Sequence, residues 1–367
     1  MARTLLAVAS RFTPYATGIL CLMAVAPMPV DAQTVTGQDR LSFSRPSAAA
    51  KAPDQKARKM VIGFHVNSID EIDWKNSTFR SDLYWWIRYP EPATEVEQAR
   101  IEALEFVNGD VENGPGKVQE KKRLAATNEI YISYRTIARF HFEPDFRKYP
   151  FDRQRFPIIV EHETLPAADL VFQDDADSYG RSGVSEALWG LGSSVRVPDL
   201  EVTRVVREFS NHEYKTNFGD PQANSATGFS RVELGIEVKR RFVPYLVKIL
   251  IPLFIILLLT YLVFFVPAQE LEVAAGLTVT SILACIAFQF TLTTNMPDVG
   301  YLMTSDRIFH LSYLLIMLAM AETVWTFNLE KSGEIKLSKR IEAWSRIVYP
   351  AGFILGMLVI VAEGLSG

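Results

Sequence analysis

Cysteine is nearly absent from this chain. Only two of the 367 residues are cysteines, Cys21 and Cys285, and each lies in a different apolar stretch. If the first stretch is removed as a signal peptide, the mature chain keeps a single thiol, which excludes an internal disulfide and a cysteine-based zinc site. The exported part of the protein must therefore be stabilised by packing.

The sequence also lacks the side-chain groupings that catalysis requires. It has five histidines, and we find no Gly-rich phosphate loop and no nucleophile placed beside a base. The net charge of -4 leaves no basic surface for nucleic acid. We therefore expect no enzyme activity, no cofactor and no nucleic-acid partner.

The N-terminus has the pattern of a secretory signal peptide, predicted over residues 1–32. Two arginines precede an apolar stretch at 19–26, and small residues follow near the expected cleavage site. Pro27 ends that stretch well short of the roughly 20 residues needed to cross a bilayer, which favours a cleaved signal over an anchor. Residues 33–58, rich in Ala, Ser, Pro, Lys and Gln, are predicted to form a flexible leader.

Residues 59–240 are predicted to form an extracellular domain made of β-strands. Short runs of Val, Ile, Tyr, Phe and Trp, among them 130–142 and 200–209, are separated by Gly, Pro, Asn and Asp. Apolar and polar residues alternate along one segment, so one strand face should be buried and the other wet; the apolar members are Val232, Leu234, Ile236 and Val238. The pattern favours an immunoglobulin-like β-sandwich.

Charge almost disappears from four later stretches, 249–267, 273–292, 308–329 and 347–362. Each is long enough, or nearly so with its flanks, to cross a membrane as a helix. The domain 241–367 should therefore be a four-helix transmembrane bundle, with helices at about 242–267, 271–294, 304–329 and 341–364.

Basic residues gather between the third and fourth stretches. The loop 330–344 contains Lys331, Lys336, Lys339 and Arg340, the excess expected on the cytoplasmic side of a membrane. This orientation places the β domain and the C-terminus outside, on the side of the membrane away from the cytoplasm.

The second span carries small and polar residues on one helical face. Steps of three or four residues from Glu272 define this stripe, with Phe290 replaceable by Thr291: Glu272, Gly276, Thr280, Leu283, Ala287, Phe290 and Thr294. A helix that lines a water-filled pore needs such a stripe. The same spacing also suits helix packing inside a bundle, where hydroxyl residues are common. Periodicity leaves both interpretations open.

If the stripe faces a pore, its two ends have different roles. Glu272 at the inner mouth would attract cations and repel anions, which predicts cation selectivity, although it could also be a solvated helix start. Leu283, Ala287 and Phe290 would form an apolar constriction that gates by dewetting.

One segment, Phe142-Glu-Pro-Asp-Phe-Arg-Lys-Tyr-Pro-Phe-Asp-Arg-Gln154, resembles the signature loop of the pentameric ligand-gated ion channels (the Cys-loop receptor superfamily) in the prokaryotic form that lacks the loop cysteines. Further matches follow in family order: Arg240-Arg-Phe-Val-Pro-Tyr245, Ile251-Pro252, Ile286-Ala-Phe288 and Thr294-Asn-Met-Pro297. The resemblance implies five subunits around a pore lined by the second helix. It implies a homopentamer that opens when an unknown small ligand, protons or divalent cations act outside the membrane. The Glu272 ring predicts that the permeant ions are monovalent cations.

The resemblance also implies a set of coupling residues at the domain junction. Asp70 and Glu71 lie in the first hairpin, Asp152 in the signature loop and Arg240 before the first span. An arginine between carboxylates could transmit movement or only clamp the two domains. The loop 295–304, stiffened by Pro297, is expected to contact this group.

The ligand site is less defined. At the family position near Glu163 the expected aromatic residue is missing. Trp85, Phe106, Tyr214 and Phe229 could form part of an aromatic cage, or they could be core residues.

Carboxylates supply a second set of candidates. Glu161, His162 and Glu163, with Asp174, Asp175 and Asp177, could bind a divalent cation such as calcium, sense protons or simply be solvated. The metal, if any, and the agonist stay open.

The main alternative is a membrane-anchored sensing or adhesion module whose helices do not conduct. Unitary currents in a lipid bilayer would distinguish it from a channel.

Overall fold

The computed structural model describes residues 57–111, 115–179, 185–193, 195–197, 199–216, 219, 227–294 and 296–365. All of them lie in one compact unit, residues 50–367. The predicted signal peptide, and the leader up to residue 56, lie outside the described residues.

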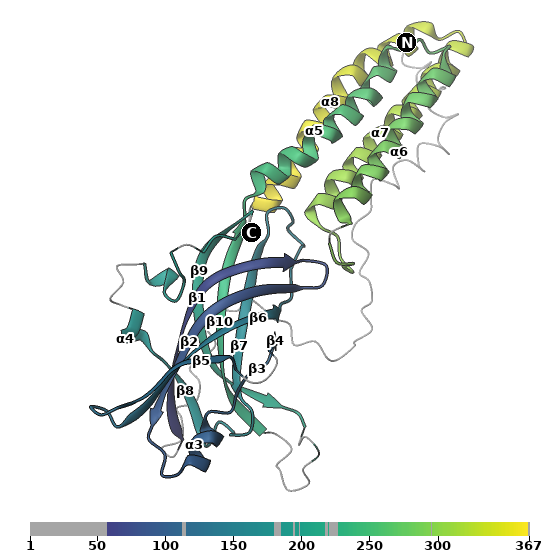
Figure 1. Ribbon diagram of the computed structural model, residues 1–367. Coiled ribbons are helices and arrows are strands. Elements are labelled where there is room, and N and C mark those ends of the chain that lie inside the picture. Colours follow the sequence, from purple (N-terminus) through teal and green to yellow (C-terminus); the bar gives the residue numbers. More distant parts are fainter. Residues whose placement is uncertain are drawn as a thin grey trace. The chain divides into compact units, whose positions relative to one another are not determined.

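The described residues of the N-terminal domain form two β-sheets (Figure 1). The larger sheet has the order β4-β6-β2-β1-β8, and β5 also pairs with β6. Its strands are β1 (Arg58–Asp73), β2 (Thr78–Pro90), β4 (Gly109–Asp110), β5 (Lys117–Leu124), β6 (Glu129–His141) and β8 (Leu170–Asp174). Only β1 and β8 of this sheet pair in parallel. The predicted 130–142 strand is β6.

The smaller sheet has the order β3-β7-β10-β9 and is antiparallel throughout. Its strands are β3 (Leu104–Phe106), β7 (Arg153–His162), β9 (Leu200–Tyr214) and β10 (Thr227–Arg240). The predicted 200–209 strand is the first part of β9. Short helical turns complete the domain: α3 (Glu95–Ile101), α4 (Ala176–Tyr179) and the 3-10 turn η1 (Glu186–Leu188).

The core lies between the two sheets. In β10, the alternating residues Val232, Leu234, Ile236 and Val238 are at most 1% exposed, as the sequence pattern predicts. The opposite face of β10 is not uniformly wet, because Gly235 is buried there. Its missing side chain lets Arg155 lie flat on the strand, where a Cβ atom at residue 235 would collide with the guanidinium group. Arg155 is ion-paired there with Glu208 and Glu233.

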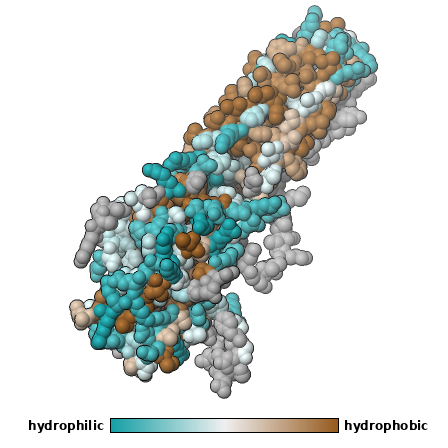
Figure 2. Space-filling view, viewed as in Figure 1, coloured by the Kyte–Doolittle hydropathy of each residue, from teal (hydrophilic) through white to brown (hydrophobic). Residues whose placement is uncertain are grey.

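Four long helices follow the β domain: α5 (Phe242–Tyr261), which continues as the 3-10 turn η2 (Leu262–Phe265), then α6 (Leu271–Thr293), α7 (Thr304–Lys331) and α8 (Ile335–Leu365). All four are long and apolar enough to cross a membrane. Figure 2 shows apolar residues gathered over these helices, whereas hydrophilic residues prevail over the β domain.

The fourth helix starts earlier than the sequence pattern predicts. α7 runs to Lys331 and α8 begins at Ile335, so the predicted loop 330–344 shrinks to residues 332–334. The charged segment was read as a loop because it is polar, but most of its residues are good helix formers. At 1.5 Å per residue, α8 is about 46 Å long, whereas the hydrocarbon core is about 30 Å thick. The first turns of α8 can therefore extend beyond the membrane.

The first span shows a smaller difference. The regular α-helix ends at Tyr261 rather than near 267, and the chain tightens into the η2 turn before Pro267. The residue before a proline is disfavoured in helical conformation, and Val266 is accordingly extended, which ends the η2 turn at Phe265.

Candidate functional site

The stripe predicted on the second span lies on one exposed face of α6. Each of its seven residues is exposed within this chain, with Leu283 60% and Phe290 73% exposed. The buried residues of α6 lie about 180° away around the helix; they are Ala274, Thr278, Ser281 and Cys285. Core packing inside one subunit is therefore wrong as an explanation of the stripe, and the whole stripe is free to meet water, lipid or another subunit.

The chemistry of this face suits contact with water. Nothing lies within 4 Å of a Cβ atom built at Gly276. The hydroxyls of Thr280 and Thr294 donate to carbonyls of their own helix at 2.8 and 2.9 Å. Their oxygen lone pairs therefore remain as acceptors on the exposed face. The alternative residue Thr291 is also exposed and bonds its own helix in the same way.

Glu272 lies in the first turn of α6 and is exposed. A carboxylate there interacts favourably with the positive end of the helix dipole, so its charge is compatible with the local backbone. The geometry thus places a negative charge at one end of the stripe and the apolar Leu283, Ala287 and Phe290 nearer the other end.

At the junction between sheet and helices, Arg240 and Asp152 form a buried ion pair. Two nitrogens of Arg240 donate to the two carboxylate oxygens of Asp152 at 2.7 and 3.0 Å, and the side chains are 4% and 1% exposed. The Arg240 guanidinium also lies about 5 Å from the rings of Trp74, Tyr149 and Tyr245.

This environment keeps Arg240 charged. Burial acts to lower the pKa of Arg240, but the hydrogen bonds and charge of Asp152 outweigh burial and raise it. Cation–π contacts with three rings add attraction in a site that water does not reach. Arg240 thus connects β10, the signature loop, the β1–β2 hairpin residue Trp74 and the first helix.

The expectation that Arg240 lies between two sets of carboxylates is wrong. Asp70 pairs with Arg80 at 3.3 Å, and Glu71 pairs with Arg139 at 2.8 Å and Arg80 at 3.6 Å. These side chains are 40–61% exposed. The sequence analysis grouped Asp70 and Glu71 with Arg240 by family position only. In the structure their carboxylates pair with two other arginines, Arg80 and Arg139.

The signature loop docks on the start of α7 instead. The Thr304 N–H donates to the Arg147 carbonyl at 3.0 Å and the Ser305 N–H donates to the Tyr149 carbonyl at 3.1 Å. The first N–H groups of a helix have no partner within it, so the signature loop caps α7. Phe146 N–H also donates to the Tyr301 hydroxyl at 3.0 Å.

The loop before α7 contacts the signature loop, but the predicted contact with the charged group of Asp70, Glu71, Asp152 and Arg240 does not appear among the hydrogen bonds and ion pairs of the described residues. Met296, Val299 and Tyr301 pack against the buried Phe146 and Tyr149. Pro297 is half-buried, and no hydrogen bond or ion pair joins it to Asp152 in the described part of the chain. Asn295 lies outside the described residues.

Two of the aromatic ligand candidates belong to the β core. Trp85 is 0% exposed, stacks on Tyr134 at 4.5 Å and donates its Nε1–H to Thr136. Phe106 is 7% exposed and packs edge-on against Trp85. A ligand cannot reach either ring, so both are wrong as cage residues.

Tyr214 and Phe229 meet at the ends of β9 and β10, with ring centroids 5.8 Å apart. The Tyr214 hydroxyl donates to Glu161 at 2.8 Å. Glu161 is 1% exposed and forms a close ion pair with Arg231. The interpretation of Glu161 as solvated surface charge is therefore wrong, because strand pairing places Arg231 directly opposite it.

His162 is 1% exposed and its protonation state follows from its hydrogen bonds. Its Nδ1 accepts the backbone N–H groups of Thr164 and Leu165 at 3.0 and 2.8 Å. Its Nε2 lies 2.9 Å from the Arg100 carbonyl, which can only accept, so the proton is on Nε2. Burial, chiefly, lowers the pKa of His162. The neutral ring holds the turn after β7.

Three carboxylates lie near one another at this end of the smaller sheet. Glu105 on β3 pairs in register with Glu161 on β7, and the exposed Glu163 follows. Glu105 is exposed as a residue. Partial burial of its carboxyl group, and then the charges of Glu163 and Glu161, raise the pKa of Glu105.

Two of the three aspartates of the predicted acidic neighbourhood are also ion-paired, and the third, Asp177, is exposed. Asp175 is 3% exposed and accepts from Arg88 at 2.6 Å and from Trp86 at 2.7 Å, while Asp174 accepts from Arg207. Among the described residues no group of three His, Cys, Asp or Glu side chains is arranged to hold a metal.

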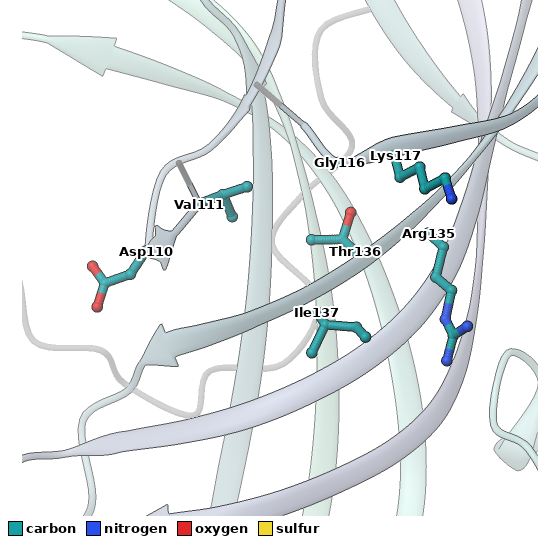
Figure 3. A pocket seen from close by; sticks show the side chains of 7 residues that line it. All are labelled: Asp110, Val111, Gly116, Lys117, Arg135, Thr136 and Ile137. Atoms are coloured by element: carbon teal, nitrogen blue, oxygen red, sulfur yellow. The ribbon is translucent and has the colours of Figure 1, made fainter. Parts of the chain in front are cut away.

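The larger sheet carries a pocket of about 540 Å³ that the sequence did not indicate (Figure 3). Asp110, Lys117 and Arg135 line it, together with Thr136. Arg135 is already held by Asp82 through two hydrogen bonds. The residues 112–114 next to it lie outside the described part, and the pocket carries no functional argument.

Sequence reasoning missed the first turn of α7 and its partner on α6. Asp306 caps this turn, because it accepts the Met303 N–H at 2.9 Å, and it also accepts from Gln289 of α6 at 3.2 Å. The run Thr304-Ser-Asp306 before an apolar stretch is a helix-start signal that could have drawn attention to it. The contact with Gln289, a polar residue within an uncharged span, could not be read from spacing.

Known proteins similar to this chain are membrane channels and receptors. It is 23% identical over 299 residues to a "Proton-gated ion channel" of Gloeobacter violaceus, covering 81% of this chain and 76% of that protein. It is also 23% identical over 266 residues to the "Acetylcholine receptor subunit alpha-type deg-3" of Caenorhabditis elegans, covering 72% of this chain and 42% of that protein.

A third relative is the "Acetylcholine-gated chloride channel subunit acc-2" of Caenorhabditis elegans, 19% identical over 293 residues, covering 74% of this chain and 61% of that protein. No family model matches the chain.

A β-sandwich followed by four long apolar helices matches the fold of the membrane-embedded, ligand-gated ion channels to which these relatives belong. More particularly, the similarity to the Gloeobacter channel supports a pentameric ligand-gated ion channel of the prokaryotic type, without the loop cysteines. Its relatives are channels, a family that is not enzymatic.

Proposed function

We propose that this chain forms a homopentameric, cation-selective channel of a bacterial inner membrane, with the β domain on the periplasmic side. The observation that carries the proposal is the uncovered stripe on α6 with Glu272 at one end. Five such stripes around an axis give a pore wall. Five Glu272 carboxylates give a ring that concentrates cations and repels anions.

The orientation rests on charge. Lys331, Lys336, Lys339 and Arg340 flank the turn between α7 and α8, where the positive-inside rule expects the cytoplasm. The C-terminus then lies outside.

Cation selectivity is tested by reversal potentials of the purified protein in planar bilayers across a potassium chloride gradient. Replacing Glu272 by Gln removes the ring charge, and we expect the cation-to-anion permeability ratio to fall on the order of tenfold. Glu270→Gln is the matched control, because Glu270 is exposed and lies two residues away, off the stripe. Unchanged reversal potentials in Glu272→Gln would contradict the selectivity assignment.

The relatives make this test necessary. They include a protein named as a chloride channel, so family membership does not determine the sign of the permeant ion. Absence of unitary currents under all conditions would favour the non-conducting sensor or adhesion module.

Protons are the opening stimulus that a specific observation favours. Glu105 is close to two further carboxylates, and its pKa is raised by burial and then by their charges. One relative is named a proton-gated channel. Protonation of Glu105 stabilises any conformation that brings these carboxyl groups together, and a rise of pH through its raised pKa disfavours that conformation.

Currents recorded from neutral to mildly acidic pH test this stimulus. Glu105→Gln removes the titrating group, so we expect the activating pH to shift while the reversal potential stays unchanged. Glu95→Gln, a carboxylate on α3, is the control. If acid evokes no current, a screen with small amines and calcium tests the remaining ligands, since the sequence left a small ligand and a divalent modulator open.

A further inference from the structure

In the described part of the chain, the hydrogen bonds between the pore helix α6 and its neighbouring helices come from a single α6 side chain. That side chain is Gln289. The hydroxyls of α6 donate instead to carbonyls of their own helix; they belong to Thr278, Thr280, Ser281, Thr291, Thr293 and Thr294.

Both ends of the Gln289 amide are held by α7. The Tyr313 hydroxyl donates to Oε1 at 2.6 Å, and Nε2 donates to Oδ1 of Asp306 at 3.2 Å. Residues 306 and 313 are seven apart, so they lie on one face of α7 about two turns from each other. A planar amide bonded at its oxygen and its nitrogen has a defined orientation, which fixes the rotation of α6 about its own axis.

The same turn of α7 is bonded to the β domain. The other oxygen of Asp306 accepts the Met303 N–H, while the Thr304 and Ser305 N–H groups donate to carbonyls of the signature loop. The first turn of α7 therefore makes hydrogen bonds in two directions, to the signature loop and to α6.

Packing also restrains the rotation of α6. Its fully buried residues are small, Ala274, Thr278, Ser281 and Cys285, and the half-buried Phe288 packs on Phe309 of α7 with ring centroids 5.7 Å apart. Small side chains let two helices approach closely, and the directed hydrogen bonds of Gln289 add to this packing in setting the rotation. Phe290 is the next residue along the chain after Gln289, and it moves around the helix axis with it.

We propose that Gln289 is a positioning residue through which displacement of the signature loop reaches the pore helix, by way of Asp306 and the first turn of α7. This inference rests on the proposed pore. Stretching the Asp306–Gln289 bond releases the rotation of α6 and carries Phe290 to a new position relative to the axis.

A labelling experiment tests the tether without any opening stimulus. The full-length Phe290→Cys protein in liposomes is treated with a water-soluble methanethiosulfonate, and Cys285, which is fully buried, gives the background in the native chain. Gln289→Met keeps the volume but removes both bonds, and Tyr313→Phe removes one hydroxyl. We expect each to change the labelling rate by at least about threefold, the lower range for side chains that share a hydrogen-bond network.

The matched control is Ser281→Ala. It removes a buried hydroxyl from α6, but that hydroxyl bonds only its own helix. We expect the labelling rate of Phe290→Cys to be unchanged in this background, which separates the tether from general destabilisation of the helix.

A second pair of variants tests the link to the signature loop. Thr304→Pro removes the N–H that bonds Arg147, at the first helical position, where proline is tolerated. Met303 is extended, at φ -83° and ψ 159°, a conformation compatible with a following proline. Thr304→Val removes only the hydroxyl, which also donates to the Arg147 carbonyl at 3.1 Å, and it keeps the N–H bond. We expect Thr304→Pro, which removes both bonds, to change labelling non-additively with Gln289→Met, and Thr304→Val, which removes one, to do so to a smaller extent.

Each outcome decides the inference. The inference is supported if the labelling rate of Phe290→Cys changes in Gln289→Met and in Tyr313→Phe, and if the effects of Thr304→Pro and Gln289→Met on that rate are non-additive. Unchanged rates or strict additivity overturn it, as does a Phe290→Cys that never reacts in any background, because Phe290 then faces no water. Failure of the proposed channel function appears separately, as absence of current in the planar bilayer.

Discussion

The β domain and the helical domain handle burial in opposite ways. In the β domain the largest apolar side chains are enclosed between two sheets, and Asp152, Glu161 and Asp175, all buried, each pair with an arginine. In the helical domain, large apolar side chains such as Phe254, Leu283 and Leu358 are exposed. The β domain thus closes its core within one chain, whereas the helices need lipid and further subunits.

The first test of this contrast concerns a buried ion pair. Asp152→Ala leaves Arg240 buried without a counter-charge, and we expect it to lower the free energy of unfolding by about 3–5 kcal/mol. Denaturant unfolding of the detergent-solubilised protein, followed by tryptophan fluorescence, measures this loss. Asp82→Ala is the control, since Asp82 also binds an arginine through two hydrogen bonds but that arginine is 42% exposed. Equal losses of unfolding free energy in Asp152→Ala and Asp82→Ala would show that burial of the Arg240–Asp152 pair does not make it more important than the more exposed Arg135–Asp82 pair.

Apolar truncation gives the next effect. Leu234→Ala opens a cavity in the enclosed β core and should cost about 2–5 kcal/mol. Leu358→Ala, at a residue 63% exposed on α8, opens none, and we expect a much smaller change. Melting temperatures in one detergent compare the two. A loss in Leu358→Ala as large as in Leu234→Ala would mean that α8 is covered within the subunit.

The pH dependence of the β domain should depend partly on His162. Its pKa lies below the ordinary 6.5, so the unfolded chain binds the proton more readily and stability is lost as pH falls from 6.5 through the lowered value. His162→Asn keeps an acceptor but does not titrate. We expect it to reduce the acid-induced loss by about 1–2 kcal/mol.

Unfolding at several pH values measures this slope. His65→Asn, at an exposed histidine, should leave the slope as it is. A slope that persists in His162→Asn would assign it to other groups.

The smallest effect is expected at the exposed hairpin. Glu71→Ala breaks a half-exposed pair with Arg139, and such pairs contribute little because solvent screens them. We expect no measurable change in melting temperature. A loss comparable to that of Asp152→Ala would mean that Glu71 contributes to the buried junction after all, which would contradict the exposed position seen in the structure.

Much of the fold was readable because it depends on local pattern. The alternation Val232 to Val238 predicted a strand with a buried face, and the uncharged stretches predicted four helices near their observed positions. The sequence predicts the start of α8 too late, because the charged residues of 330–344 indicate a loop. A helix can continue beyond the hydrocarbon core into the polar region of a membrane, and α8 begins at Ile335.

The site was readable only in part, for a physical reason. The stripe on α6 follows from helical periodicity, so Glu272 to Thr294 were found to share one face. The partners of Arg240, Glu161 and Gln289 depend on which chain segments fold next to one another. Arg80 and Arg139 captured Asp70 and Glu71 because hairpin pairing places them across from that segment.

The sequence by itself determined the class of each segment, since hydrophobic period and uncharged length act within a few turns or one strand. It also determined that α6 has one distinct face. Only the tertiary structure decided that Trp85 is enclosed in the β core, that Arg240 forms its ion pair with Asp152 and not with Asp70 or Glu71, and that Gln289 joins α6 to α7. Such contacts depend on short distances between residues far apart in the chain, which no local pattern records.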